Sequence, residues 1–188
     1  TTVTLTNTTG TIAFNGALTA TTLNTAAQAY NVALNASTGT ITNAVTFSNT
    51  GTVTLGTSAG TLAFTGGVVA TAPSAINLAG TITTNSAAVS LGASTKTLTL
   101  VADSTINTYA DSGAGGAITI GGPVQGTSAG SQSLTLISKG GVVTISDVVG
   151  SVVKLGTLTL GNADQTGAIT VNGTIVADVL TVGASSGT

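Results

Sequence analysis

Short runs in which apolar residues alternate with threonine constrain the fold of this chain more than any other feature. Alternation at a period of two places Val and Leu on one face of an extended strand and Thr on the other, as a half-buried β-strand requires. The β-branched side chains of Thr, Val and Ile also favour a pleated sheet, and the intervening Gly, Asn, Ser and Asp tolerate tight turns. The clearest runs are TVTLT at 2–6, TVTL at 52–55, TLTL at 97–100, LTL at 134–136 and TLTL at 157–160.

This pattern predicts an all-β chain of short, closely spaced strands. One stretch, residues 22–35, lacks the alternation and is expected to form either a turn of helix or a bulged strand. The chain also repeats itself, because residues 2–21 match residues 52–71 at about half of their positions with an offset of 50. Shorter matches join GTIT at 39–42 with GTIT at 80–83, and GAITI at 116–120 with GAITV at 167–171.

Self-similarity over tens of residues is typical of solenoids, and the spacing of the runs suggests coils of about 20 residues with two or three strands each. Roughly nine such coils, stacked about 4.8 Å apart, would form a rod on the order of 40 Å long. The narrow interior of a solenoid favours Val, Ile, Leu and Ala over large aromatic residues, and stacked coils disfavour rows of like charge. We therefore expect residues 1–188 to form one parallel β-solenoid domain, as a segment of a longer chain or an assembled subunit. An antiparallel β-sandwich, as in a filament subunit, is the alternative.

Charge is almost absent from the sequence. Only 4% of the 188 residues are charged, against about a quarter in a typical soluble domain. The mean hydropathy of +0.55 nevertheless predicts a folded chain, because disordered chains combine low hydrophobicity with high net charge. The charged residues are Lys96, Lys139, Lys154, Asp103, Asp111, Asp147, Asp164 and Asp178.

Several classes of protein are excluded by this composition. Three Lys against five Asp form no basic patch for nucleic acid. Without cysteine there is neither a disulfide framework nor a thiolate metal site. No run of about 18 apolar residues is present, so no membrane-spanning helix is expected, and no signal peptide is recognisable.

The strand sequences Leu-Thr-Leu, Gly-Thr-Ile-Thr and Gly-Ala-Ile-Thr-Val, with their Gly-Asn and Asn-Gly turns, resemble the degenerate repeats of filamentous haemagglutinin-type adhesins. They are similar also to autotransporter passenger regions. The resemblance covers nearly the whole chain and implies a secreted, right-handed parallel β-helix that projects from or coats a bacterial surface. It implies no catalytic residue. The near-total lack of charge departs from that family and allows a dedicated fibre or sheath subunit as well as an adhesin shaft.

The chain has few residues that could act in catalysis. A Ser–His–Asp triad is excluded because the chain has no His. Ser–Lys pairs are available at Ser94 with Lys96 and at Ser138 with Lys139, since a nucleophilic serine needs an adjacent base. For both pairs we expect a solvated lysine at a coil edge, and no catalytic role.

Paired carboxylates could hydrolyse a glycan. The five Asp residues lie in different predicted turns, and the closest pair is Asp103 and Asp111, in a longer loop predicted at 103–116 that contains Tyr109. Sugar-cleaving β-helix enzymes add Arg, His or further acids, which this chain lacks. The sequence therefore predicts that the protein is not an enzyme and has no catalytic, cofactor-binding or metal-binding residues.

Weaker binding motifs remain open. Calcium could bind at Asp103 with Asp111, or at Asp164 with Asn162, although neither a calcium-binding nonapeptide nor an EF-hand occurs; the alternative is that each Asp caps its own turn. The glycine-rich stretches 113–116 and 121–122 are expected to be turns, because a phosphate-binding loop would need a following Lys and helix. Glycosylation sequons lie at Asn7, Asn35 and Asn172.

The missing charge favours self-association, because net charge normally keeps proteins apart and sheet edges are usually blunted by charge or proline. We expect a non-catalytic structural component of an extracellular bacterial fibre, sheath or adhesin shaft. One alternative is a glycan-binding adhesin module, for which Tyr30 and Tyr109 are the candidate contacts. Another is an ice-binding solenoid. Its Thr-x-Thr triplets begin at 2, 52, 81, 97 and 157, and this uneven spacing argues against the one-per-coil ladder that ice binding requires.

Overall fold

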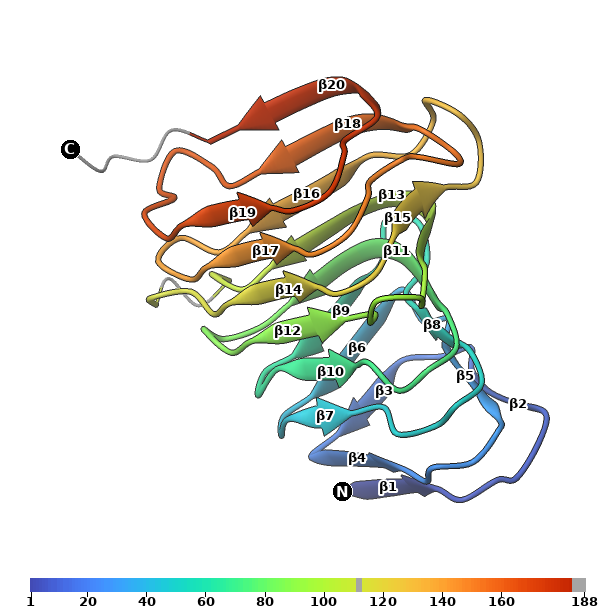
Figure 1. The fold of residues 1–188 in the computed structure, drawn as a ribbon. Coiled ribbons are helices and arrows are strands. Elements are labelled where there is room, and N and C mark those ends of the chain that lie inside the picture. Colours follow the sequence, from blue (N-terminus) through green and yellow to red (C-terminus); the bar gives the residue numbers. More distant parts are fainter. Residues whose placement is uncertain (111–112, 184–188) are drawn as a thin grey trace.

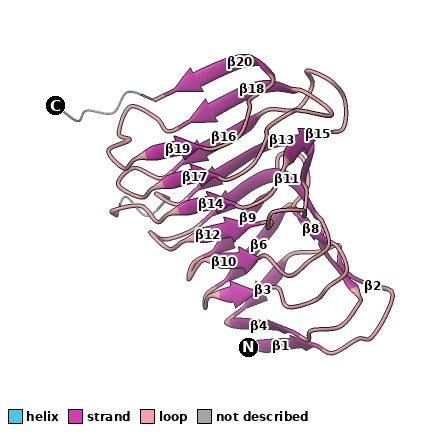
Figure 2. Ribbon diagram, in the orientation of Figure 1, coloured by secondary structure: helices cyan, strands magenta, loops and turns pink. Residues whose placement is uncertain are grey.

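A computed structural model describes residues 1–110 and 113–183. The chain is all-β and forms a right-handed parallel β-solenoid of about 8 turns, which rises from the blue N-terminal coil to the red C-terminal coil (Figure 1). Over the described residues the ribbon contains strands and loops without a helix (Figure 2). The strands form three faces, here named A, B and C, and all pairs between named strands are parallel. In the last two coils only the single bridge residues Val149 and Ile175 continue face B. The parallel pairing confirms the solenoid and shows that the alternative β-sandwich is wrong.

Face A is the near face in Figure 1. Its strands, two of which form a separate pair at the N-terminal end, stack in chain order from bottom to top. They are β1 (Thr2–Leu5), β4 (Thr22–Thr25), β7 (Val45–Thr46), β10 (Val68–Ala70), β12 (Val89–Leu91), β14 (Ile118–Ile120), β17 (Val143–Ile145) and β19 (Ile169–Val171).

Faces B and C follow face A along the chain and belong to one continuous sheet. The strands of face B are β2 (Thr11–Phe14), β5 (Asn31–Leu34), β8 (Val53–Leu55), the first halves of β11 (Ile76–Thr83) and β13 (Leu98–Asn107), and β15 (Val124–Gly126). The strands of face C are β3 (Leu18–Ala20), β6 (Thr38–Ile41), β9 (Thr61–Phe64), the second halves of β11 and β13, β16 (Leu134–Ile137), β18 (Leu155–Leu160) and β20 (Ala177–Val182). Strands β11 and β13 pass from face B to face C, and their register shifts between Leu78 and Gly80.

The core is a column of inward side chains produced by the period-two pattern. In β13, Leu98 and Leu100 are fully buried while Thr99 between them points outward. Like residues stack on like: Leu100 pairs with Leu78, which in turn pairs with Leu55. Each coil therefore buries its aliphatic residues against the coils above and below it, which a single coil could not do alone.

The interior also holds large aromatic residues, contrary to the expectation of a purely aliphatic column. Phe47 and Phe64 are fully buried, and their rings meet edge to face with centroids 6.4 Å apart, a favourable geometry for aromatic pairs. Tyr30 is also fully buried, and its hydroxyl donates a hydrogen bond to the Leu5 carbonyl at 3.0 Å.

The alternating runs all form strands, as the sequence predicts. Residues 22–35, by contrast, form β4 and β5 joined by a turn, so the helical turn or bulged strand expected there is wrong. The estimate of nine coils is also too high, because most coils are longer than the 20 residues of the first one. Thr2 pairs with Thr22, whereas Ser104 pairs with Leu134, 30 residues further on.

The sequence repeats differ in structural meaning. Strands β1 and β8, which the offset of 50 aligns, lie on faces A and B, and the aligned strands β2 and β9 lie on faces B and C. That repeat therefore reproduces a strand–turn–strand unit and not a coil. The match between GAITI at 116–120 and GAITV at 167–171 does follow the coils, because Ile118 and Ile169 both pair with Val143 on face A.

Candidate functional surfaces

The lysines of the two Ser–Lys pairs are engaged in structural contacts. The Lys96 ammonium donates hydrogen bonds to the carbonyls of Thr71 at 2.8 Å and Ala72 at 2.6 Å. The Lys139 ammonium donates to the Tyr109 hydroxyl at 3.2 Å and lies 4.3 Å from the centroid of that ring. This cation–π contact joins the coil of Lys139 to that of Tyr109.

Ser138 belongs to a buried polar stack that the sequence analysis missed. The stack follows the corner between faces C and A on successive coils and consists of Thr84, Thr108, Ser138 and Gln165. The hydroxyl of Ser138 donates to the Gly141 carbonyl at 2.6 Å, and that of Thr108 donates to the Gly116 carbonyl at the same distance. Buried polar groups need such partners, so this stack satisfies the carbonyls of the corner and holds the chain in its turn.

The acidic residues that the structure describes have separate partners. Asp103 lies in β13, not in a loop, and accepts a hydrogen bond from the Ser133 amide at 2.8 Å. The predicted loop at 103–116 is therefore too long, since the strand continues to Asn107. Asp111 lies outside the described residues, so the Asp103–Asp111 calcium pair stays a prediction.

The second candidate calcium site is a local turn. The amide of Asp164 donates to the Asn162 side-chain oxygen at 3.1 Å, which is the contact expected of an Asx turn. Asp178 lies in β20, not in a turn, and pairs with Lys154. Within residues 1–110 and 113–183, no three His, Cys, Asp or Glu side chains gather at a distance suited to a metal ion.

Of the seven charged side chains that the structure describes, five lie in the connections between strands, and Asp103 and Asp178 lie within β13 and β20. The outward ladders of the flat faces are uncharged. The outward ladder of face A consists of Thr46, Val69, Ser90, Thr119, Thr144 and Thr170. The outward ladder of face B consists of Thr54, Asn77, Thr99 and Gln125.

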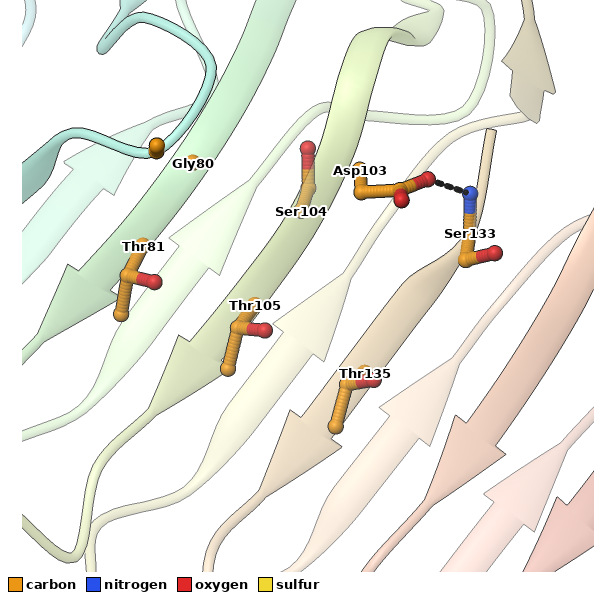
Figure 3. A pocket seen from close by; sticks show the side chains of 8 residues that line it. Gly80, Thr81, Asp103, Ser104, Thr105, Ser133 and Thr135 are labelled. Atoms are coloured by element: carbon orange, nitrogen blue, oxygen red, sulfur yellow. Dashed lines mark hydrogen bonds between the residues drawn. The ribbon is translucent and has the colours of Figure 1, made fainter. Parts of the chain in front are cut away.

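Face C carries threonine at one position on seven consecutive coils. The ladder consists of Thr38, Thr61, Thr81, Thr105, Thr135, Thr159 and Thr181. Figure 3 shows three of these side chains, on β11, β13 and β16, pointing the same way in one row. The uneven spacing of the threonines in sequence was therefore misleading, because loops of different lengths at the corners bring them into register.

A shallow hollow of about 320 Å³ lies beside this ladder. It forms where the chain bends from face B to face C, since Gly80 has no side chain and its neighbours are small (Figure 3). The lining residues are Ala59, Gly80, Thr81, Asp103, Ser104, Thr105, Ser133 and Thr135. Asp103 is the one charged group among them, so the hollow presents hydroxyls and a carboxylate that is already bonded to a backbone amide.

The two tyrosines proposed as ligand contacts differ in exposure. Tyr30 is fully buried in the core and therefore unable to contact a glycan, so that prediction is wrong. Tyr109 is partly exposed beside Lys139. Of the glycosylation sequons, Asn7 and Asn172 are exposed, whereas the Asn35 amide donates to the Asn15 side-chain oxygen at 3.1 Å.

Comparison with protein-family models, with curated proteins and with solved structures gives no match for this chain. Over the described residues, no helix is long and apolar enough to cross a membrane. The functional interpretation therefore rests on the fold and on the chemistry of its surfaces.

Proposed function

We propose that this chain is a non-catalytic structural element of an extracellular bacterial fibre, sheath or adhesin shaft, and that copies pack side by side through its uncharged faces. The supporting observation is the separation of charge: the ladders of faces A, B and C are neutral, and the charged side chains that the structure describes lie outside these ladders. Burying Thr, Ser and Val faces avoids the desolvation cost that charged groups would impose. The extracellular location rests on the resemblance to secreted adhesin repeats.

The flat shape of the faces supports the same role. Parallel strands in register give each face a regular relief, with rows of outward residues that repeat from coil to coil, so two faces can meet along their whole length. Nothing in such a contact depends on a charge pair. Ordinary salt screening should therefore leave the association nearly unchanged, which distinguishes it from adhesion between charged surfaces.

We expect a Thr119→Lys/Thr144→Lys variant of face A to associate at least tenfold more weakly than the parent chain. The two ammonium groups would lie on adjacent coils of one face, where burial in a contact would strip their water. Sedimentation velocity over a range of protein concentrations measures the change. The matched control is Ser94→Lys/Ser151→Lys, which adds the same charge at exposed turn positions.

The control variant should associate like the parent chain. The proposal is wrong if the parent chain sediments as a monomer at every concentration. If the Thr119→Lys/Thr144→Lys variant assembles as readily as the control variant, face A is not a contact surface.

A second function, binding to ice, is favoured by the ladder of face C. Seven threonines on a rigid sheet, about 4.8 Å apart, present an evenly spaced row of hydroxyl and methyl groups to a surface that itself repeats. We expect the parent chain to show thermal hysteresis if this ladder contacts ice, and Thr105→Lys to abolish it. Thr99→Lys, on face B of the same strand, is the matched control that should keep it. The absence of thermal hysteresis in the parent chain would refute the ice-binding function.

A further inference from the structure

The hollow at the bend from face B to face C holds polar groups that the solenoid itself does not use. One oxygen of the exposed Asp103 carboxylate accepts a hydrogen bond from the Ser133 amide at 2.8 Å. Its second oxygen, and the hydroxyls of Thr81, Thr105 and Thr135, have no hydrogen-bond partner among the described residues. These groups therefore remain available to a ligand within one concave surface (Figure 3).

The groups are held rigidly, because each stands on a strand of one continuous sheet. Thr81, Thr105 and Thr135 pair directly on β11, β13 and β16, so neighbouring hydroxyls repeat at about 4.8 Å. At the bend, Ser104 is 3% exposed, and its hydroxyl donates to the Leu78 carbonyl of the coil below at 3.2 Å. A site that is already ordered loses little conformational entropy when a ligand binds.

The chemistry of the lining selects a neutral ligand rich in hydroxyl groups. None of the described residues that line the hollow is a lysine, so an anionic ligand would meet the charge of Asp103 without a partner. None is aromatic or a large aliphatic residue, which disfavours a mainly apolar ligand. One carboxylate alone is a poor site for a metal ion. Ligand hydroxyls, by contrast, both donate and accept, so they match the carboxylate and the threonine hydroxyls together.

The hollow is elongated along the solenoid axis. Its lining residues come from the coils of β9, β11, β13 and β16, and three coil spacings amount to about 14 Å. Its volume of about 320 Å³ lies at the lower end of the range of about 300–1,000 Å³ that is usual for ligand pockets. A short chain of linked sugar rings fits this outline better than a single compact ligand.

We propose that the hollow binds a neutral oligosaccharide that lies along the solenoid axis. Asp103 accepts hydrogen bonds from ring hydroxyls, and the threonine hydroxyls contact the sugar along its length. The site binds the sugar and leaves it intact, because glycoside hydrolysis uses a pair of carboxyl groups and the lining contains one. This binding goes beyond the structural role proposed above and does not depend on the packing of face A.

Isothermal titration calorimetry with cellohexaose, maltohexaose and chitohexaose tests the site. We expect the parent chain to bind at least one of these three sugars. Asp103→Asn keeps an oxygen for the Ser133 amide but removes the charge, and it should weaken binding by about tenfold. Thr105→Val keeps the shape of the side chain but removes the hydroxyl, and it should weaken binding by about fivefold.

Two control variants match these substitutions. Asp164→Asn removes an exposed carboxylate elsewhere, and Thr99→Val removes an outward hydroxyl from face B of the same strand. Both should bind the sugar like the parent chain. Circular dichroism during thermal denaturation checks that each variant folds, and Thr105→Val keeps the test decisive if the Asp103 variant does not. A hexamer of galacturonic acid should bind more weakly than the neutral sugars, because its carboxylates would face Asp103.

The proposal is overturned if none of the three neutral hexasaccharides binds the parent chain, or if Asp103→Asn and Thr105→Val bind as tightly as their controls. Tighter binding of the galacturonic acid hexamer than of the neutral sugars would also overturn it. In sedimentation velocity the Asp103→Asn variant should associate like the parent chain. A failure of the sugar site is therefore distinguishable from a failure of the side-by-side packing.

Discussion

Replacing Leu100 with aspartate is expected to abolish cooperative folding, with a loss of more than about 4 kcal/mol in the free energy of unfolding. Leu100 is fully buried in β13 and stacks on Leu78, which stacks on Leu55. A carboxylate at this position would interrupt the column in a middle coil and would be buried without a partner. Far-UV circular dichroism during urea titration measures the change.

Thr99→Asp is the control for this substitution. Thr99 lies next to Leu100 on the same strand but points outward, so its replacement should cost less than about 1 kcal/mol, as for most surface substitutions. Equal losses in the two variants would mean that the inward and outward assignments of β13 are wrong. Wild-type stability in the Leu100 variant would contradict the stacked core itself.

Replacing Gly150 with alanine is expected to destabilise the protein by about 3 kcal/mol or more, through backbone strain combined with overpacking. Gly150 has a φ of +71°, a conformation that side-chain-bearing residues adopt at a cost. A Cβ atom there would also overlap the carbonyl oxygen of Val176 in the next coil. Urea or thermal denaturation followed by circular dichroism measures the loss.

Two other glycines separate these effects. Gly10 has a φ of +82° but no atom within 4 Å of a built Cβ, and Gly16 likewise has open space without the positive φ. We expect Gly10→Ala to cost about 1 kcal/mol for the backbone conformation alone. Gly16→Ala should be nearly neutral or slightly stabilising. If all three variants lost the same stability, close stacking of the coils at Gly150 would be refuted.

The strands could be predicted from sequence because their pattern is local. Alternation of Thr with Val or Leu decides which residues turn inward, whatever the neighbouring coils do, so runs such as 97–100 and 157–160 were placed correctly. The number and length of the coils are harder to predict from sequence. They depend on corner loops, whose residues leave no periodic signal, and the strongest repeat, at an offset of 50, aligns strands of different faces.

The surfaces could be predicted only in part for the same reason. Neutral faces followed directly from the composition, but the ladder of face C is hidden by corner loops of unequal length. Tyr30 and Ser138 were weighed as exposed or reactive groups because a sequence does not show which side chains enter a corner or the core. Their burial follows from stacking: the Tyr30 hydroxyl bonds to the carbonyl of Leu5, 25 residues earlier, and Ser138 lies against Gln165 of the next coil.

Cryo-electron microscopy of the parent chain, at a concentration where sedimentation shows association, tests the central claim most directly. We expect particles in which two or more solenoids, each with a coil repeat of about 4.8 Å, lie side by side with neutral faces in contact and charged residues facing solvent. Isolated single solenoids at every concentration, or assemblies joined through the charged residues, would contradict the account.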